Sequence, residues 1–385
     1  MRTEISKANA TEVWYECLAI AFRELERITI SEWANREAYF AQSESFKSET
    51  APARYSTDDC PMQKEPQDEL TNPEVQVHVW LWASRLGKTR MWINAAGYFI
   101  DQEPSTQMAM YPTQDDADSE AKERLQPVID ATPSLQGKVS EAKGGSGENT
   151  IRLKKYRGGF LAYVGSNSPS KLRRRAARVL FADEIDGYKS SSGKEGGPIG
   201  LLFNRAKNFR RPVKILSSTP TIKNHSPIEE WYERSDKRQW FCPCVECGEF
   251  QTLKWSQFKW PGKERSRTRY HCESCDHPHT EVEREKMIRR GEWRATAAFT
   301  GVRGYFLPGF YSIFPCADSM KGKMHEFAEE VHTANHSSNK REDVRRLVNT
   351  FFAQTYQEEQ DAKQEWRSLY DRREEYKAVP LTGGK

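Results

Sequence analysis

Gly87, Lys88 and Thr89 form a Gly-Lys-Thr triplet of the kind that binds nucleotide phosphates. An alternating, β-branched run over 75–82 precedes the triplet and predicts a strand, and a largely apolar run over 90–100 follows it and predicts a helix. In this setting backbone N–H groups and the helix N-terminus cradle the phosphates. Lys88 would reach the outer phosphates, and the Thr89 hydroxyl would hold Mg2+.

One position departs from the usual phosphate-loop pattern, G-x-x-x-x-G-K-[ST]. The pattern requires glycine at position 82, where the chain has Trp82. A Gly-Lys-Thr triplet alone is a weak signal, but its strand-helix setting and the acidic residues downstream favour phosphate binding. Ser84, inside the same loop, is a further candidate for nucleotide contact.

Two acidic residues, Asp183 and Glu184, follow a short apolar run over 178–182 that has the length of a buried strand. If that strand neighbours the phosphate-loop strand, both carboxylates lie beside the phosphates. Asp183 would then hold the Mg2+ shell, and Glu184 would orient and deprotonate the attacking water. Taken alone, the pair fits a solvated loop equally well. The upstream triplet favours the catalytic interpretation, so we expect an ATPase.

A third run, over 212–220, predicts a strand that ends in small hydroxyl residues. We expect this strand to lie between the other two, where Ser218 and Thr219 could sense the γ-phosphate and couple hydrolysis to movement. Serine, threonine and proline are also common turn residues, so an ordinary strand-to-turn exit is the alternative.

Four of the eight cysteines form two Cys-x-x-Cys pairs, with 24 residues between the pairs. The spacing predicts a structural zinc site with ligands Cys244, Cys247, Cys272 and Cys275. Disulfides are the alternative, which is improbable in an intracellular chain. A four-thiolate site has no open position for catalysis, so its role would be to hold the surrounding module together. Competing ligands that this pattern does not require are Cys242, His271, His277 and His279.

Composition excludes several classes of protein. The chain has 385 residues, and 11% of its side chains are aromatic, which is ample for packed cores. Its length predicts about two or three domains. It contains no apolar run of about 18 residues and no signal-peptide pattern, so we expect a soluble, intracellular protein that makes no use of a membrane.

The net charge is only +4, but positive charge is concentrated between residues 151 and 215, where 16 Lys or Arg accompany four acids. The densest part contains Lys171, Arg173, Arg174 and Arg175. A basic stretch beside an ATPase site suggests sequence-independent, salt-sensitive contact with a nucleic-acid backbone. One of these arginines could instead act as a finger on a neighbouring subunit's nucleotide. A solvated basic face is the third interpretation.

Taken in order, short segments along most of the chain resemble one family, the large subunit of the lambda-type phage DNA-packaging terminase. The resemblance begins with a Ser-Glu-Trp-Ala segment and includes the acidic strand end and the first cysteine pair. The segments that carry it are 30–34, 111–113, 124–127, 132–135, 168–173, 183–186, 218–221, 243–249, 291–293, 309–312 and 349–350.

The resemblance implies an ATP-driven motor that moves double-stranded DNA into a procapsid. Such subunits form a homo-oligomeric ring on the portal, with a small terminase subunit that recognises viral DNA. It also implies action in the host cytoplasm, transiently on the procapsid and not in the mature virion. Family members carry a C-terminal metal-dependent nuclease. This chain ends about where that domain begins, so we expect the motor without the nuclease.

The resemblance also draws attention to Arg85, because the family tends to have glutamine there. An arginine in this loop could face the γ-phosphate as a catalytic trigger in cis, or it could be a surface residue that tolerates change.

The expected fold is α/β, with a mainly parallel P-loop sheet flanked by helices and an inserted zinc ribbon. We expect a helical N-terminal region and linker over 1–65, the motor over 66–235, the zinc ribbon over 236–293 and a C-terminal helical region over 294–385.

Two other functions are consistent with the same motifs. A superfamily-2 helicase or translocase shares the Asp-Glu-Ile-Asp and Ser-Thr strand ends, but it needs a second RecA-like domain, for which the residues after Pro220 leave too little room. A non-catalytic DNA-binding assembly protein with a vestigial nucleotide site would explain Trp82. The joint presence of Lys88, Thr89, Asp183 and Glu184 argues against it.

Overall fold

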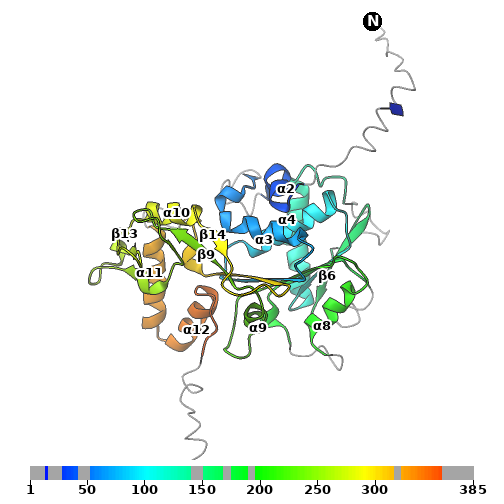
Figure 1. The fold of residues 1–385 in the computed structure, drawn as a ribbon. Coiled ribbons are helices and arrows are strands. Elements are labelled where there is room, and N and C mark those ends of the chain that lie inside the picture. The colour runs from blue at the N-terminus through cyan, green and yellow to red at the C-terminus, as the bar shows by residue number, and fades with distance from the viewer. Residues whose placement is uncertain are drawn as a thin grey trace, which may run out of the picture.

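A ten-stranded sheet runs through the middle of the molecule, with helices on both faces (Figure 1). The structure is a computed structural model, and it describes residues 14–15, 28–41, 53–139, 151–167, 175–189, 196–315 and 322–357. The sheet has the order β10-β9-β15-β3-β8-β7-β4-β6-β5, and β14 pairs with β9. Its strands are β3 (Val77–Trp82), β4 (Gln107–Tyr111), β5 (Leu153–Tyr156), β6 (Gly159–Gly165), β7 (Val179–Ala182), β8 (Val213–Ser218), β9 (Arg238–Pro243), β10 (Phe250–Gln251), β14 (Glu292–Arg294) and β15 (Val302–Leu307).

The central strands are parallel, and antiparallel pairing is confined to β5, β10 and β14. Parallel strands covered on both faces are continuous apolar runs, and every residue of β3 and of β7 is buried. Strand β8 lies between them, the position predicted for it. The carboxyl ends of β3, β8 and β7 therefore meet at one edge of the sheet. The expected fold class, a mainly parallel α/β sheet flanked by helices, is confirmed.

Helices α2, α3 and α4 cover one face of the sheet, and α8 and α9 lie on the other (Figure 1). The helices are α2 (Ile30–Glu37), α3 (Lys64–Asp68), α4 (Lys88–Asp101), α5 (Gln114–Ser119), α6 (Gln126–Ala131), α8 (Pro198–Phe203), α9 (Pro227–Glu233), α10 (Glu281–Arg289), α11 (Lys323–His336) and α12 (Lys340–Thr350).

Helix α2 is fixed against α4, the helix that follows the phosphate loop. It begins with a capping box in which Thr29 accepts from the backbone of Glu32 and Glu32 accepts from that of Thr29. The Trp33 ring lies so close to Gly97 of α4 that any side chain at position 97 would overlap it. The Trp33 indole N–H also donates to Asp101 over 2.7 Å. These contacts hold α4, and hence the loop before it, in place.

Large aromatic rings fill the core behind the carboxyl edge of the sheet. Trp92 of α4 stacks on Phe181 of β7, with 4.5 Å between ring centroids. Trp82, which replaces the usual glycine, is completely buried and stacks on Trp293 at 6.0 Å. The side chain of Trp82 therefore points into the core, so its bulk does not obstruct the phosphate loop.

Some of the residues after 236 form strands of the large sheet, and others form a separate small sheet. Strands β9 and β14, inside the predicted zinc-ribbon range, join the sheet, and a separate three-stranded sheet contains β11 (Phe258–Lys259), β12 (Arg269–His271) and β13 (Pro278–His279). Strand β15 pairs with β3, although the sequence had predicted only helices over 294–385. Helices α11 and α12 then pack against each other.

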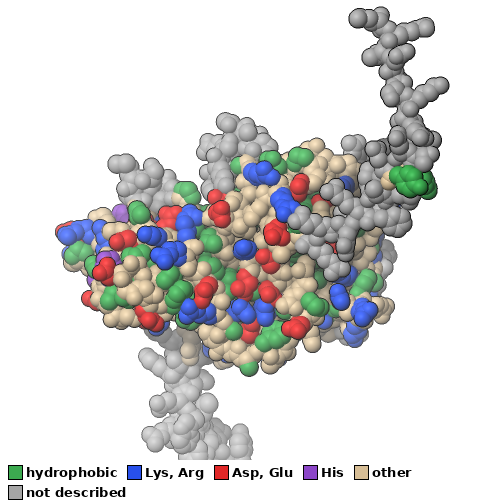
Figure 2. Space-filling view, turned by 45° about the horizontal axis from the view of Figure 1, so that its top comes forward, with side chains coloured by type: hydrophobic (Ala, Val, Ile, Leu, Met, Phe, Trp, Pro, Cys, Tyr) green, Lys and Arg blue, Asp and Glu red, His purple; other side chains and the backbone are tan. Residues whose placement is uncertain are grey.

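One face of the molecule is polar and mixed in charge (Figure 2). On the face in Figure 2, basic and acidic side chains are interspersed, and apolar ones are scattered between them. Within the ranges that the structure describes, every helix is too short or too polar to cross a membrane.

Candidate active site

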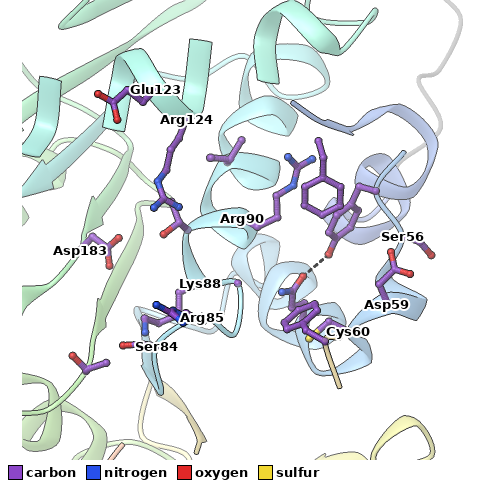
Figure 3. A pocket seen from close by; sticks show the side chains of 18 of the residues that line it. Ser56, Asp59, Cys60, Ser84, Arg85, Lys88, Arg90, Glu123, Arg124 and Asp183 are labelled. Carbon is purple, nitrogen blue, oxygen red and sulfur yellow. Dashed lines mark hydrogen bonds between the residues drawn. The ribbon is translucent and has the colours of Figure 1, made fainter. Parts of the chain in front are cut away.

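A cavity of about 1050 Å3 opens where β3 and β7 end and α4 begins (Figure 3). It brings together the two predicted motifs, which lie about a hundred residues apart in the chain. The predicted site residues that line it are Ser84, Arg85, Gly87, Lys88, Thr89, Asp183, Glu184 and Thr219.

The phosphate loop has two residues in the left-handed region of backbone conformation. Gly87 has φ +85°, which glycine adopts without cost, and it ends the loop as the N-cap of α4. Arg85 has φ +61°, which is uncommon for a residue with a side chain, and such strained residues cluster at functional sites. A buried glutamine supports the loop, because the Gln63 amide donates to the Leu86 carbonyl over 3.1 Å.

The Lys88 ammonium is held over the loop. Its Nζ atom donates to the carbonyls of Trp82 at 2.8 Å and Ala83 at 3.0 Å. Burial lowers the pKa of Lys88 to about 8, although the nearby Asp183 and Glu184 carboxyls act in the opposite direction. Lys88 is thus a cation whose charge is costly to bury, so a bound anion would stabilise it.

The two carboxyls face Lys88 from the end of β7. Burial raises the pKa of Asp183, and the charge of Lys88 opposes that effect. The pKa of Glu184 is raised by burial and by the neighbouring Asp183. Glu184 also has φ +50°, a second strained residue at the cavity. An elevated carboxyl pKa suits a group that must accept a proton from water.

The loop after β8 is linked to the acidic strand end. The Asp186 carboxylate accepts from the Thr221 hydroxyl and from the Ile228 backbone, both over 2.9 Å. Thr219 lines the cavity, whereas Ser218 is buried behind it and donates to the Thr219 carbonyl over 2.8 Å. Of the two predicted coupling residues, Thr219 therefore faces the cavity directly.

The other end of the cavity is aromatic, and no sequence motif had pointed to it. Phe40, Tyr55 and Ile93 line it, and the Arg90 guanidinium lies 4.4 Å from the Phe40 ring centroid and 5.2 Å from that of Tyr55. Tyr55 donates to Gln63, the glutamine that supports the phosphate loop, over 2.8 Å. Flat apolar walls with nearby amides suit a nucleoside base. We call this part of the cavity the base end, and the part at Lys88 and Thr89 the phosphate end.

Residues 49–293, well over half of the chain, match the family described as phage terminase large subunit gpA, ATPase domain. The chain belongs to this terminase family.

Curated relatives agree with that assignment. The chain is 26% identical over 254 residues to the terminase large subunit of Enterobacteria phage P21, and 24% identical over 253 residues to that of Escherichia phage lambda. Each alignment covers 64% of this chain but only 39% and 38% of the two relatives.

Similar solved structures are also terminases. The HK97 bacteriophage large terminase has a TM-score of 0.42 and 12% identity, over 54% of this chain and 41% of that one. The large terminase ATPase domain of Thermus phage P74-26 has a TM-score of 0.38 and 11% identity, over 73% of this chain and 88% of that one.

The expectation that this terminase chain lacks the nuclease domain is wrong. Residues 302–383 match the description terminase large subunit gpA, endonuclease domain. The described part of that match contains β15, α11 and α12. Because β15 is hydrogen-bonded to β3, the strand of the phosphate loop, this segment is built into the ATPase sheet.

The four predicted zinc ligands of this terminase chain come together. Their sulfur atoms all lie within 4.8 Å of one another, and two of the distances are 3.9 and 3.8 Å. Tetrahedral zinc with bonds of about 2.3 Å would separate its sulfurs by about 3.8 Å. The cysteines are free, so the disulfide alternative is not supported. The four residues are Cys244, Cys247, Cys272 and Cys275.

Both cysteine pairs have the same local geometry. The residue after each pair, Gly248 or Asp276, has positive φ, and its N–H donates to the carbonyl of the pair's first cysteine over 3.1 Å. Such turns direct two thiols to one point, and they fit a closed structural site. His279 supports the cluster from outside, with Nε2 at 3.3 Å from the Cys244 sulfur. Cys242 is buried and is not part of the cluster.

Of the four predicted basic residues, the structure describes Arg175, which does not line the cavity. Arg175 is exposed beyond the amino end of β7, the end opposite Asp183, and its guanidinium lies 5.8 Å from the Phe160 ring centroid. Lys171, Arg173 and Arg174 lie outside the described residues.

Proposed function

We propose that this chain is the ATP-hydrolysing motor of a terminase large subunit that packages double-stranded DNA into procapsids. One observation carries the proposal: Lys88 and Thr89 share a cavity with Asp183 and Glu184, at the carboxyl ends of the parallel strands β3 and β7 on either side of β8. Ligands bind at this edge in α/β sheets, and phosphoryl transfer requires this set of a cation, a hydroxyl and two carboxylates.

The proposed mechanism assigns one task to each group. Lys88 and the α4 N-terminus bind the phosphates, and the aromatic end of the cavity takes the adenine. Thr89 and Asp183 would hold Mg2+, which neutralises charge on the phosphates. Glu184 orients the attacking water and takes its proton. Thr219 would sense the loss of the γ-phosphate and couple hydrolysis to movement. Its loop is linked to the acidic strand end, because the Thr221 hydroxyl donates to Asp186.

Exposed positive charge supports DNA as the substrate. Arg157, Arg175, Lys207, Arg210 and Arg211, here called the basic edge, are exposed near the amino ends of β6, β7 and β8. None of the five forms an ion pair with a residue in the ranges that the structure describes. Cations without acidic partners on an exposed surface fit a polyphosphate backbone.

The partners and the metal follow from the same proposal. The motor would act in the host cytoplasm as a homo-oligomeric ring on the portal, with a small terminase subunit, and would leave before the virion matures. Zinc would be structural, in the module over 236–293, and the motor would occupy 66–235. Lys171, Arg173, Arg174 and Arg175 would contact DNA or a neighbouring subunit's nucleotide, in place of forming only a solvated basic face.

The test is the steady-state ATPase rate with and without long double-stranded DNA, with Glu184→Gln as the blank. Stimulation by DNA that the substitution abolishes would support the motor. An ATPase rate equal to the blank, in a folded chain that holds its zinc, would favour the non-catalytic assembly protein. Unwinding of a duplex with an overhang would favour the helicase.

The match of residues 302–383 to the endonuclease domain supports DNA cleavage as a second candidate activity. It is tested with supercoiled plasmid and Mg2+, using the Glu184→Gln chain so that translocation does not contribute. Nicked or linear product would support cleavage, and intact plasmid would contradict it.

A further inference from the structure

Arg124 lies in a segment with unusual helical geometry beside the cavity. Between α5 and α6 the chain forms a π-helical segment, η5 (Glu120–Leu125). A π-helical turn widens the helix and shifts the side chains that follow, and such turns are frequent at functional sites. Here the shifted part of the helix contains Glu123 and Arg124, both of which line the cavity.

The Arg124 guanidinium approaches the acidic pair from the side opposite the phosphate loop. In Figure 3 its side chain extends from η5 toward Asp183, with Lys88 across the cavity. Burial raises the pKa of Asp183 and Glu184, and the charge of Arg124 acts against that effect at both groups, as Lys88 does. The guanidinium is therefore close enough to influence both carboxyls.

Most of the guanidinium is available for a ligand. Its Nε atom pairs with Glu120 over 3.1 Å, one turn earlier in the same helix. It has no other hydrogen bond or ion pair within the part of the chain that the structure describes. A guanidinium has five N–H donors in a planar fork, so the pair with Glu120 can orient the group while its terminal N–H groups face the cavity.

The other arginines at the cavity are placed differently. Arg90 is almost fully buried against the aromatic rings at the base end. Arg85 is exposed on the phosphate loop itself, on the same side as Lys88. Arg124 alone among these three comes from the wall opposite the loop (Figure 3). A triphosphate in the cavity would thus have Lys88 on one side and Arg124 on the other.

We propose that Arg124 is a catalytic residue that contacts the γ-phosphate of bound ATP in cis and stabilises the negative charge that develops there during hydrolysis. The proposal deepens the proposed ATPase function and rests on it. An ordinary surface ion pair with Glu120 is the competing explanation, and it predicts almost no effect of substitution.

The experiment compares the wild-type chain with Arg124→Gln and Arg124→Lys. We would measure kcat for ATP, and equilibrium affinity for ADP and for the slowly hydrolysed analogue ATPγS. Removal of one transition-state donor costs about 10²- to 10³-fold in kcat, so Arg124→Gln should lose about that much. It should bind ATPγS at least tenfold more weakly and ADP within twofold of wild type. Arg124→Lys should recover part of both losses, because it retains the charge without the fork.

Arg234→Gln is the matched control. Arg234 also forms an i,i+4 ion pair, with Glu230, and is similarly exposed, but it lies away from the cavity. Its substitution should leave kcat and both affinities unchanged. Wild-type kcat in Arg124→Gln, or equal weakening of ADP and ATPγS, would overturn the role of Arg124 alone. A wild-type chain that binds neither nucleotide would instead overturn the proposed function, and the role of Arg124 with it.

Discussion

Gly87 has two separate reasons to be glycine, and they can be measured apart. Its φ of +85° disfavours any side chain, and a Cβ atom would overlap the amide of Gln63, which is fixed between Leu86 and Tyr55. Gly137 has φ +74° with open space around it, so it has only the first constraint. We expect Gly137→Ala to cost about 1–2 kcal/mol of unfolding free energy. Gly87→Ala should cost about 1–3 kcal/mol more, because its Cβ atom would also overlap the Gln63 side chain. Urea denaturation of both variants gives the difference, and equal losses would contradict the overlap.

The pKa of Lys88 predicts how ATP affinity depends on pH. Burial lowers this pKa to about 8, and only the protonated ammonium attracts phosphate. ATP affinity should therefore be constant below pH 8 and weaken above it, by at most tenfold per pH unit. Above pH 8 the Lys88 amine is mostly neutral, so it must take up a proton from solvent when ATP binds. Isothermal titration between pH 6.5 and 9.5 would show the inflection. Lys88→Arg, which keeps its charge throughout this range, should show none near pH 8. A flat wild-type profile would contradict the prediction.

At the residue scale, the sequence could predict the groups that belong to a local pattern. Lys88 and Thr89 adjoin a glycine and precede a helix, and Asp183 and Glu184 end an apolar run, so neighbouring residues identify them. Phe40, Tyr55 and Arg124 could not be predicted this way. They reach the cavity from three other segments, and only folding brings them together. Arg124 belonged to a segment that resembled the terminase family, but nothing in the sequence placed that segment beside the carboxylates.

At the scale of elements, the proposed zinc module is attached to the wall of the proposed nucleotide cavity. Arg284 of α10 is completely buried and donates to the carbonyls of Phe310 at 2.9 Å and Ser312 at 3.0 Å. The Tyr311 hydroxyl accepts from the Leu253 backbone and donates to the Trp240 carbonyl. The same segment continues to Phe314 and Pro315, which line the cavity. The module therefore supports part of the cavity wall.

Loss of zinc should consequently weaken nucleotide binding. Cys247→Ser removes one thiolate, and we expect it to reduce bound zinc from about one per chain to well below that, and to lower thermal stability. ADP affinity should fall by up to about tenfold, or 1.4 kcal/mol, because the 309–315 segment loses its support. Metal analysis and a binding titration measure the two effects. Cys242→Ala, outside the cluster, should keep both zinc and affinity. Zinc loss with unchanged ADP affinity would show that the module and the cavity are independent.

The elements themselves were predictable where the sequence pattern was continuous. Strands β3, β7 and β8 are apolar runs that end in recognisable residues, and their adjacency followed from the chemistry expected at their ends. Strand β15 was missed, because Val302–Leu307 contains an arginine and a glycine and ends in no catalytic residue. Its neighbours decide its structure: it pairs with β3 over its whole length, and Gly304 leaves room for the Ser235 side chain.

At the scale of the whole molecule, the nucleotide cavity and the basic edge lie at opposite ends of the parallel strands. The proposed catalytic groups follow the carboxyl ends of β3 and β7, whereas Arg175 and Arg211 lie near the amino ends of β7 and β8. DNA bound at the basic edge would therefore not enter the nucleotide cavity, and the two activities should be separable by substitution. Each parallel strand would also connect the cavity rigidly to the basic edge.

That separation leads to a prediction about salt dependence. Arg175→Glu combined with Arg211→Glu should weaken double-stranded DNA binding and leave the ATPase rate without DNA unchanged. The slope of log affinity against log salt should become shallower by about 0.9 for each phosphate contact that is lost, because fewer counterions are released on binding. Fluorescence anisotropy between about 50 and 200 mM salt gives the slope. Lys259→Glu makes the same reversal on β11, outside the basic edge, and should leave the slope unchanged. If the double variant retains both the wild-type slope and affinity, DNA binds to another surface. If the slope falls and stimulation of hydrolysis by DNA disappears with it, the basic edge is the surface through which DNA reaches the motor.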